Sequence, residues 1–173
     1  MVRGKGLYVW DVEGKKYMDF LNGYSSSNQG HCHPKIVDAL VKQSKLITQT
    51  SRAFYNEHLG DCAEYLCKLL KFDKMLPMNG GVEAAETAVK LARRWGYVVK
   101  KIPENQAVVL MAKGNFWGRT ITASGACDDP QRYSNFVPFT PGFDLINYND
   151  IADLKAKLLH HGNNVCAVML EPI

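Results

Sequence analysis

Two segments of the chain combine residue types that suit a phosphate and a planar ring. The first, Asn79-Gly80-Gly81-Val82, lies between a short apolar pattern and a long helical pattern. Glycines let the backbone approach a ligand closely, and free N–H groups at a positive helix end favour a phosphate. The spacing matches neither GxGxxG nor GxxxxGK(S/T). The pattern by itself therefore leaves open a turn that only reverses the chain.

The second segment is Gly114-Asn115-Phe116-Trp117-Gly118-Arg119-Thr120, which follows a compact apolar run at 107–111. An aromatic face can stack on a conjugated ring, and a guanidinium can hold a carboxylate with two parallel hydrogen bonds. In the alternative interpretation, Phe116 and Trp117 anchor the core and Arg119 is a surface residue. Composition alone favours that alternative.

A third polar segment, Tyr24 to His33, contains two histidines in Gln29-Gly30-His31-Cys32-His33. Histidines at this spacing can bind a metal, but a third ligand at matching spacing is missing. We expect both histidines to serve in capping and loop hydrogen bonds instead.

Nucleophilic catalysis has no support in the motifs. The chain contains no GxSxG elbow and no recognisable Cys–His signature. Its five cysteines include no CxxC pair, so neither a zinc site nor a disulfide framework is indicated. We expect free thiols in a reducing compartment.

The elements that must position these segments alternate between strands and helices. A hairpin is predicted around Glu13-Gly14, with strands at 7–12 and 16–20. Apolar spacing predicts helices beginning at Pro34, after Asn56, over about 82–98 and after Asp150, and strands at 74–78, 107–111 and 165–170. Strands that are apolar on both faces and alternate with helices indicate an α/β fold with a mostly parallel sheet.

Composition excludes several classes of protein. The 173 residues are 46% hydrophobic and 22% charged, close to globular averages. No apolar run approaches the roughly 20 residues of a membrane span. The net charge of +4 is spread over the chain rather than clustered on one face, so we expect neither a nucleic-acid nor a membrane partner.

Taken together, the sequence resembles the class III aminotransferases, and within them the ornithine aminotransferases. The similarity extends over essentially the whole chain. It is carried by RGKGLYVWDVEGKKYMDFL, Tyr24-Ser25, NQGHCHPKIV, TSRAFYN, LPMNGGVEAAETAVKLARRWGY, GNFWGRT, FTPGFD and the final LEPI. Among relatives, the SRAFYN run points to ornithine rather than to acetylornithine or γ-aminobutyrate as the amino donor.

The resemblance implies a pyridoxal 5'-phosphate enzyme of fold type I and assigns roles to individual residues. Gly81 and Val82 would hold the cofactor phosphate through backbone N–H groups. Phe116 would stack on the pyridine ring with Trp117 beside it. Arg119 looks like the substrate-carboxylate arginine, and Tyr24 like the tyrosine that lines the ornithine pocket. No metal is implied.

One position departs from the family pattern. The residue before Gly81 is commonly Ser or Thr in relatives, where its hydroxyl can add a phosphate contact, whereas here it is Gly80. Losing that hydroxyl would weaken phosphate binding by roughly 0.5–1.5 kcal/mol.

The implied reaction transfers the δ-amino group of L-ornithine to 2-oxoglutarate by a ping-pong mechanism, giving glutamate-5-semialdehyde and glutamate. The alternatives are another ω-amino-acid or acetylornithine aminotransferase of the family, or a short non-catalytic paralogue that acts as a binding partner. We expect a homodimer or higher homo-oligomer, located in the mitochondrial matrix or the cytoplasm.

The resemblance also implies an incomplete enzyme. The family's Schiff-base lysine lies further along than Ile173, so no catalytic residue is assigned and the chain alone is expected to be inactive. Residues 1–28 are expected to belong to the small domain, and 29–173 to the first part of a large cofactor-binding domain. A chain that stops just after a buried strand agrees with truncation.

Overall fold

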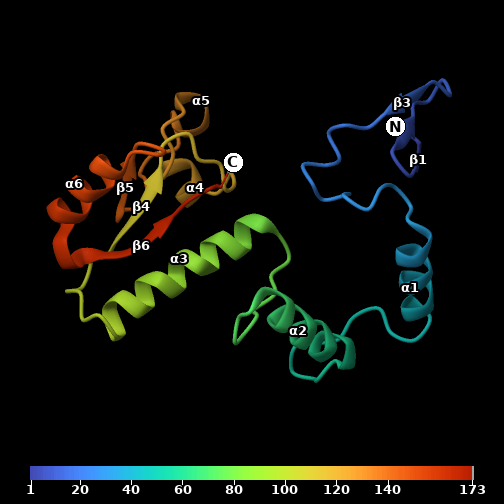
Figure 1. Ribbon diagram of the computed structural model, residues 1–173, viewed down its shortest axis with the longest axis horizontal. Helices are drawn as coiled ribbons and strands as arrows, with labels where there is room; N and C mark the ends of the chain where they lie inside the picture. Colours follow the sequence, from blue (N-terminus) through green and yellow to red (C-terminus); the bar gives the residue numbers. More distant parts are fainter. Residues whose placement is uncertain (173) are drawn as a thin grey trace. The chain divides into compact units, whose positions relative to one another are not determined.

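The structure is a computed structural model that describes residues 1–172. The chain divides into two compact units, Met1–Lys74 and Met75–Ile173 (Figure 1). Each unit is described by itself. The predicted division after residue 28 concerns the assignment to domains of the complete protein, and it stays a prediction.

The first unit begins with a small antiparallel sheet of strands β1 (Arg3–Lys5), β2 (Tyr8–Trp10) and β3 (Lys16–Met18), in the order β1-β2-β3. Strands β2 and β3 form the predicted hairpin, with Val9 opposite Tyr17. The Asp11 carboxylate shapes its turn by accepting hydrogen bonds from the backbone N–H groups of Glu13 and Lys15, at 3.0 and 2.9 Å.

Two helices complete the first unit, α1 (Pro34–Ser44) and α2 (Glu57–Leu70). Both begin where the sequence predicts. Pro34 occupies the first turn of α1, where its missing N–H costs nothing. The Asn56 side chain caps α2 by accepting from Leu59 N at 3.1 Å.

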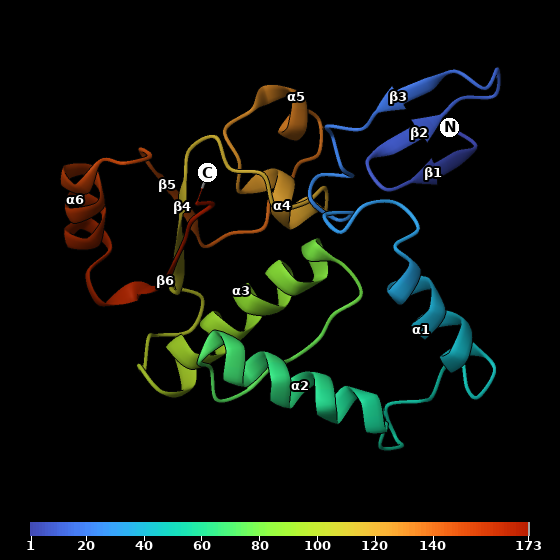
Figure 2. The ribbon, with the colours of Figure 1, turned by 45° about the vertical axis from the view of Figure 1, so that its right-hand side comes forward.

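The second unit contains a parallel sheet in the order β5-β4-β6, formed by β4 (Val108–Ala112), β5 (Phe143–Ile146) and β6 (Val165–Met169). Helices cover both of its faces (Figure 2). Val109 and Met111 pack with Val89 of α3 (Gly81–Val98) on one face. Leu110 on the opposite face packs in the cluster that includes Leu154 of α6 (Ile151–His161). The predicted α/β class with a parallel sheet is confirmed.

The alternation of burial along β4 explains why this strand is central. Val109, Leu110 and Met111 are each at most 1% exposed. Successive side chains of a strand point to opposite faces, so a strand buried on both faces must be apolar throughout. The run at 107–111 is therefore the core of this unit, as predicted.

Two details differ from the sequence-based expectation. Residues 74–78 form no strand, because no neighbouring segment among the described residues pairs with them. The stretch from 114 to 147, which lies outside every helix and strand predicted from the sequence, contains the short helices α4 (Ile121–Gly125) and α5 (Pro130–Tyr133) as well as β5. Strand β5 has only four residues, too few for a clear periodic pattern. Over residues 1–172, none of the helices has the length and apolarity to cross a membrane.

Candidate functional site

The candidate site of the second unit lies where the loop after β4 meets the beginning of α3. A Cβ atom on Gly118 would overlap the Val82 side chain, so only glycine allows this close approach. The Thr120 hydroxyl donates a hydrogen bond to Glu86 on the next turn of α3. Together, these contacts join the GNFWGRT segment to the helix terminus that the sequence analysis selected for a phosphate.

The N-terminus of α3 has backbone donors and room for an anion. Gly80 is its N-cap residue and supplies no side-chain hydrogen bond. The first N–H groups of a helix have no intrahelical acceptors, and the helix dipole makes this end positive. A Cβ on Gly80 or Gly81 would meet no atom of the described chain within 4 Å. The space beside Gly81 and Val82 therefore fits a phosphate.

One acidic side chain of the first helical turn is bonded to the backbone just before the helix. The Glu83 carboxylate accepts a hydrogen bond from the backbone N–H of Asn79 at 3.1 Å. It thereby satisfies one donor that precedes the helix, in the manner of a capping box. The donors of the first helical turn are left available.

Phe116 presents an exposed ring on an anchored backbone. The ring is 44% exposed, and the Phe116 N–H donates to Glu171 Oε2 at 3.1 Å. The guanidinium carbons of Arg132 and Arg119 lie 4.9 and 5.6 Å from the ring centroid. An exposed aromatic face of this kind can stack on a planar ligand.

Trp117, in contrast, packs against the core. Its ring centroid lies 6.3 Å from that of Phe143, and it borders the cluster of Val109 and Met111. Its indole N–H is buried and has no hydrogen-bond partner within residues 1–172. The core-anchor interpretation therefore describes the packing of Trp117 but not that of Phe116. A role for Trp117 beside the cofactor stays a prediction.

Asn115 holds the loop in place, and the sequence analysis did not select it. It is only 5% exposed, and its Nδ2 donates to the carbonyl oxygens of Ala112 and Ala126 at 2.8 and 3.0 Å. Arg132 adds a hydrogen bond to the Asn115 carbonyl oxygen at 3.0 Å. The only signal of this role in the sequence is the position of Asn115, a polar residue between a buried strand and two aromatic residues.

Tyr24 lies in the first unit, in a tight turn that follows β3. Its ring is 86% exposed. His31 makes the expected loop contact, with Nε2 lying 2.7 Å from Asp19 Oδ2. His33 occupies the N-cap position of α1, but its side chain makes no capping hydrogen bond, so that part of the prediction is wrong. The Val37 N–H bonds to the His33 backbone oxygen instead, at 3.0 Å.

All five cysteines are free thiols. Within the described part of the chain, no group of three or more His, Cys, Asp or Glu side chains could hold a metal ion.

Comparison with known proteins gives one family over the whole chain. The aminotransferase class-III model matches residues 1–173. Mitochondrial ornithine aminotransferases from Drosophila ananassae and Rattus norvegicus are 57% and 55% identical over 171 residues, which is 99% of this chain. The chain spans about 40% of the length of such relatives.

Solved structures share the fold. An ornithine aminotransferase from Toxoplasma gondii, described with partial occupancy of pyridoxal phosphate at its active site, superposes with a TM-score of 0.95 at 46% identity, covering 99% of this chain and 40% of that one. An acetylornithine aminotransferase from Elizabethkingia anophelis gives a TM-score of 0.82 at 55% identity, with 99% and 41% covered.

Proposed function

The chain belongs to the class III aminotransferases, and from that premise we propose that the protein is an ornithine aminotransferase. It transfers the δ-amino group of L-ornithine to 2-oxoglutarate and yields glutamate-5-semialdehyde and glutamate. The donor is supported by relatives of that name at 55–57% identity. The SRAFYN run at residues 51–56 is the local feature that supports it.

The observation that carries the proposal is the junction of the loop 114–120 with α3. There the open helix terminus at Gly81 and Val82 and the exposed ring of Phe116 belong to the same unit, held together by the Gly118–Val82 approach. A phosphate donor set next to an aromatic face suits a phosphorylated aromatic cofactor.

We propose pyridoxal 5'-phosphate as this cofactor. When bound, it supplies an electron sink and carries the amino group from one substrate to the other. The N–H groups of Gly81 and Val82 hold its phosphate, and the Phe116 ring covers one face of the pyridine. Trp117 lies beside Phe116 at the cofactor ring.

Two further residues are proposed to bind substrate. The Arg119 guanidinium is exposed and can pair with a carboxylate through two parallel hydrogen bonds. Tyr24 lines the pocket for the ornithine side chain, where its hydroxyl can donate or accept one hydrogen bond.

The remaining proposals concern the complete protein. Residues 1–28 belong to its small domain and 29–173 to its cofactor-binding domain, and two subunits form a homodimer. Several relatives are named mitochondrial, which supports the mitochondrial matrix over the cytoplasm.

The test uses the protein expressed from its complete coding sequence and saturated with pyridoxal phosphate. Initial rates are measured with ornithine, N-acetylornithine and γ-aminobutyrate as donors and 2-oxoglutarate as acceptor. We expect kcat/KM for ornithine to exceed the other two by at least about ten-fold, a transition-state difference of about 1.4 kcal/mol. A preference for either other donor would contradict the proposal.

A second candidate is an acetylornithine aminotransferase. It is favoured by the structural similarity to the Elizabethkingia anophelis enzyme, whose 55% identity equals that of the rat relative. The same donor comparison decides between the two functions. Absence of turnover with every donor, together with absence of cofactor binding, would instead indicate a non-catalytic paralogue.

A further inference from the structure

The turn that carries Tyr24 has an unusual backbone. Four consecutive residues have left-handed φ angles: Asn22 at 53°, Gly23 at 54°, Tyr24 at 54° and Ser25 at 71°. Residues other than glycine are disfavoured in this region, and they normally enter it singly. A strained run of this kind persists only where the surrounding structure holds it, and such strain gathers at functional sites.

The Tyr24 side chain does not hold the turn. Tyr24 is 86% exposed, so packing of its side chain contributes little. The hydrogen bonds inside the turn are short-range, such as Tyr24 N to the Leu21 oxygen at 3.0 Å and Ser27 N to the Asn22 oxygen at 3.2 Å. Contacts made by the residues that flank the turn on either side are therefore the candidates to hold its conformation.

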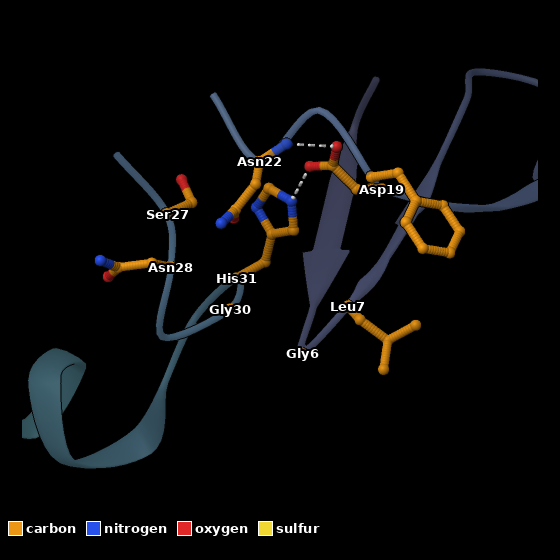
Figure 3. Close-up of a pocket in the computed structure, with 9 residues that line it drawn as sticks. Gly6, Leu7, Asp19, Asn22, Ser27, Asn28, Gly30 and His31 are labelled. Carbon is orange, nitrogen blue, oxygen red and sulfur yellow. Dashed lines mark hydrogen bonds and ion pairs between the residues drawn. The ribbon is translucent and has the colours of Figure 1, made fainter. Parts of the chain in front are cut away.

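The outside contacts converge on Asp19 (Figure 3). Its Oδ1 accepts hydrogen bonds from the N–H of Leu21, directly before the left-handed run, and from the N–H of Asn22, the first residue of the run, at 3.0 and 2.9 Å. Its Oδ2 lies 2.7 Å from Nε2 of His31, at the other end of the loop. The Asn22 amide and then His31 hold the pKa of Asp19 below its usual value, so the carboxylate is charged and accepts all three bonds.

His31 is itself tied to the sheet. The backbone N–H of His31 donates to the backbone oxygen of Gly6 at 2.7 Å, and the backbone N–H of Gly6 donates to the backbone oxygen of His31 at 2.9 Å. Its ring also lies against β1, because a Cβ on Gly4 would come within 2.8 Å of the His31 ring. Asp19 and His31 therefore join both ends of the loop 20–30 to the same strands. The pocket of about 290 Å³ that they border lies inside this loop.

We propose that Asp19 and His31 are positioning residues for Tyr24, which hold its turn in the left-handed form that presents the phenol to the substrate. This proposal rests on the proposed function, in which Tyr24 lines the ornithine pocket. A turn that is ordered before the substrate arrives spares the ordering cost of binding. Loss of the pair should therefore raise KM for ornithine while kcat and cofactor affinity stay nearly constant.

Asp11 offers a matched control in the same unit. Its Oδ1 also accepts two backbone N–H groups, from Glu13 and Lys15, and its Oδ2 accepts from the Tyr17 hydroxyl at 2.7 Å. It thus makes the same number and kind of hydrogen bonds as Asp19, but in the turn of the β2–β3 hairpin. The Asp11→Ala variant therefore shows how much KM and amide exchange change when such a carboxylate is removed elsewhere in the unit.

The experiment compares Asp19→Ala, Asp19→Asn, His31→Ala and Asp11→Ala in the cofactor-loaded protein from the complete coding sequence. We expect Asp19→Ala to raise KM for ornithine by about 3–10-fold, the scale of ordering one or two groups on binding. His31→Ala should give a smaller rise, because the bonds of Asp19 to Leu21 and Asn22 remain. Asp19→Asn should restore KM to near the wild-type value, because an amide oxygen still accepts and its NH₂ can donate to neutral His31. Asp11→Ala should leave KM unchanged.

Hydrogen exchange supplies a readout that does not depend on activity. Asp19→Ala should speed exchange of the amides of residues 20–30, whereas Asp11→Ala should not. Equal KM and equal exchange in Asp19→Ala and Asp11→Ala would overturn the proposal, as would a fall in kcat alone. A wild-type protein without ornithine turnover would instead contradict the proposed function, and the exchange result would then decide whether the pair orders the turn. If Asp19→Ala does not fold, His31→Ala decides by the same two readouts.

Discussion

At the scale of single residues, the candidate site depends on glycines that have no side chain as much as on the side chains of Phe116 and Arg119. Gly80 and Gly81 leave open space at the beginning of α3, where a side chain on either would meet no described atom within 4 Å. The backbone of Phe116 is held by Glu171, while its side chain stays partly exposed beside Arg119 and Arg132. The exposed guanidinium of Arg119 is free of the core packing that restrains Trp117.

Gly80→Thr should increase the affinity for pyridoxal phosphate. The N-cap backbone at φ −150° and ψ 166° accepts any residue, and the added hydroxyl can donate to the phosphate. One such hydrogen bond is worth about 0.5–1.5 kcal/mol, or roughly 2–10-fold in Kd. Titration of the apoprotein with cofactor checks this. Thermal unfolding without cofactor serves as the control, since a better N-cap should add only a few tenths of a kcal/mol.

Arg119→Lys should raise the KM values of both substrates by about ten-fold, because lysine cannot form two parallel hydrogen bonds with a carboxylate. Cofactor affinity should stay within about two-fold of wild type, as the change leaves the phosphate donors intact. Arg94→Lys, on an exposed position of α3, is the matched control. Steady-state kinetics with each substrate varied in turn provides the measurement. An unchanged KM would remove Arg119 from the substrate site.

At the scale of elements, ionic contacts fix α6 to the edge strand β5. Lys157 Nζ lies 2.8 Å from both Asp144 carboxylate oxygens, and His161 Nε2 lies 2.7 Å from Oδ2. Burial raises the pKa of Asp144, but the hydrogen bonds from Lys157 and His161 outweigh it and lower the pKa from 3.8 to about 2. The helix is therefore held most firmly while this carboxylate is charged.

The contribution of Asp144 to stability should depend on pH. A carboxylate whose folded pKa is depressed stabilises the fold above its unfolded pKa near 3.8, and this contribution is lost as pH falls towards about 2. Asp144→Asn should lower the free energy of unfolding by about 1–2 kcal/mol at pH 6, allowing for solvent screening. The difference from wild type should shrink between pH 4 and pH 2. Urea unfolding over that range measures it, with the exposed Asp61→Asn as control. A difference independent of pH would contradict the assignment.

At the scale of the whole molecule, the chain spans about 40% of the length of its relatives. The second unit brings together the N-terminus of α3, which is proposed to bind phosphate, and the loop 114–120, which carries Phe116. Tyr24, in contrast, lies in the first unit. Helix α1 has no buried residue, and even its apolar residues Ile36 and Leu40 are 53% and 67% exposed. These apolar side chains are available for contacts beyond those described.

The mass of the protein in solution tests the proposed homodimer. Sedimentation equilibrium of the protein from its complete coding sequence should give twice the subunit mass, or a higher even multiple, over the micromolar range. The cofactor-free protein serves as the control for dependence on pyridoxal phosphate. A monomer at all concentrations would contradict the proposal.

The sequence by itself determined the features that arise from neighbouring residues. Pro34 and Asn56 mark helix beginnings because caps act within a single turn. The run at 107–111 marks a buried strand because its side chains are apolar on both faces. Residue types also pointed to the segments at Gly81 and Phe116, but the family resemblance, rather than their spacing, assigned their roles.

Only the tertiary structure decided the contacts between residues distant in the chain. The bond from Phe116 to Glu171 joins residues 55 positions apart, and no local pattern encodes it. The expected strand at 74–78 did not form, because strands need a partner and propensity supplies none. The Asp19–His31 pair was likewise invisible in the sequence, which predicted a loop hydrogen bond for His31 but not its partner. Local patterns mark where helices begin and where a buried strand lies, whereas the pairing of strands and the side chains that hold a loop in place depend on packing between elements far apart in sequence.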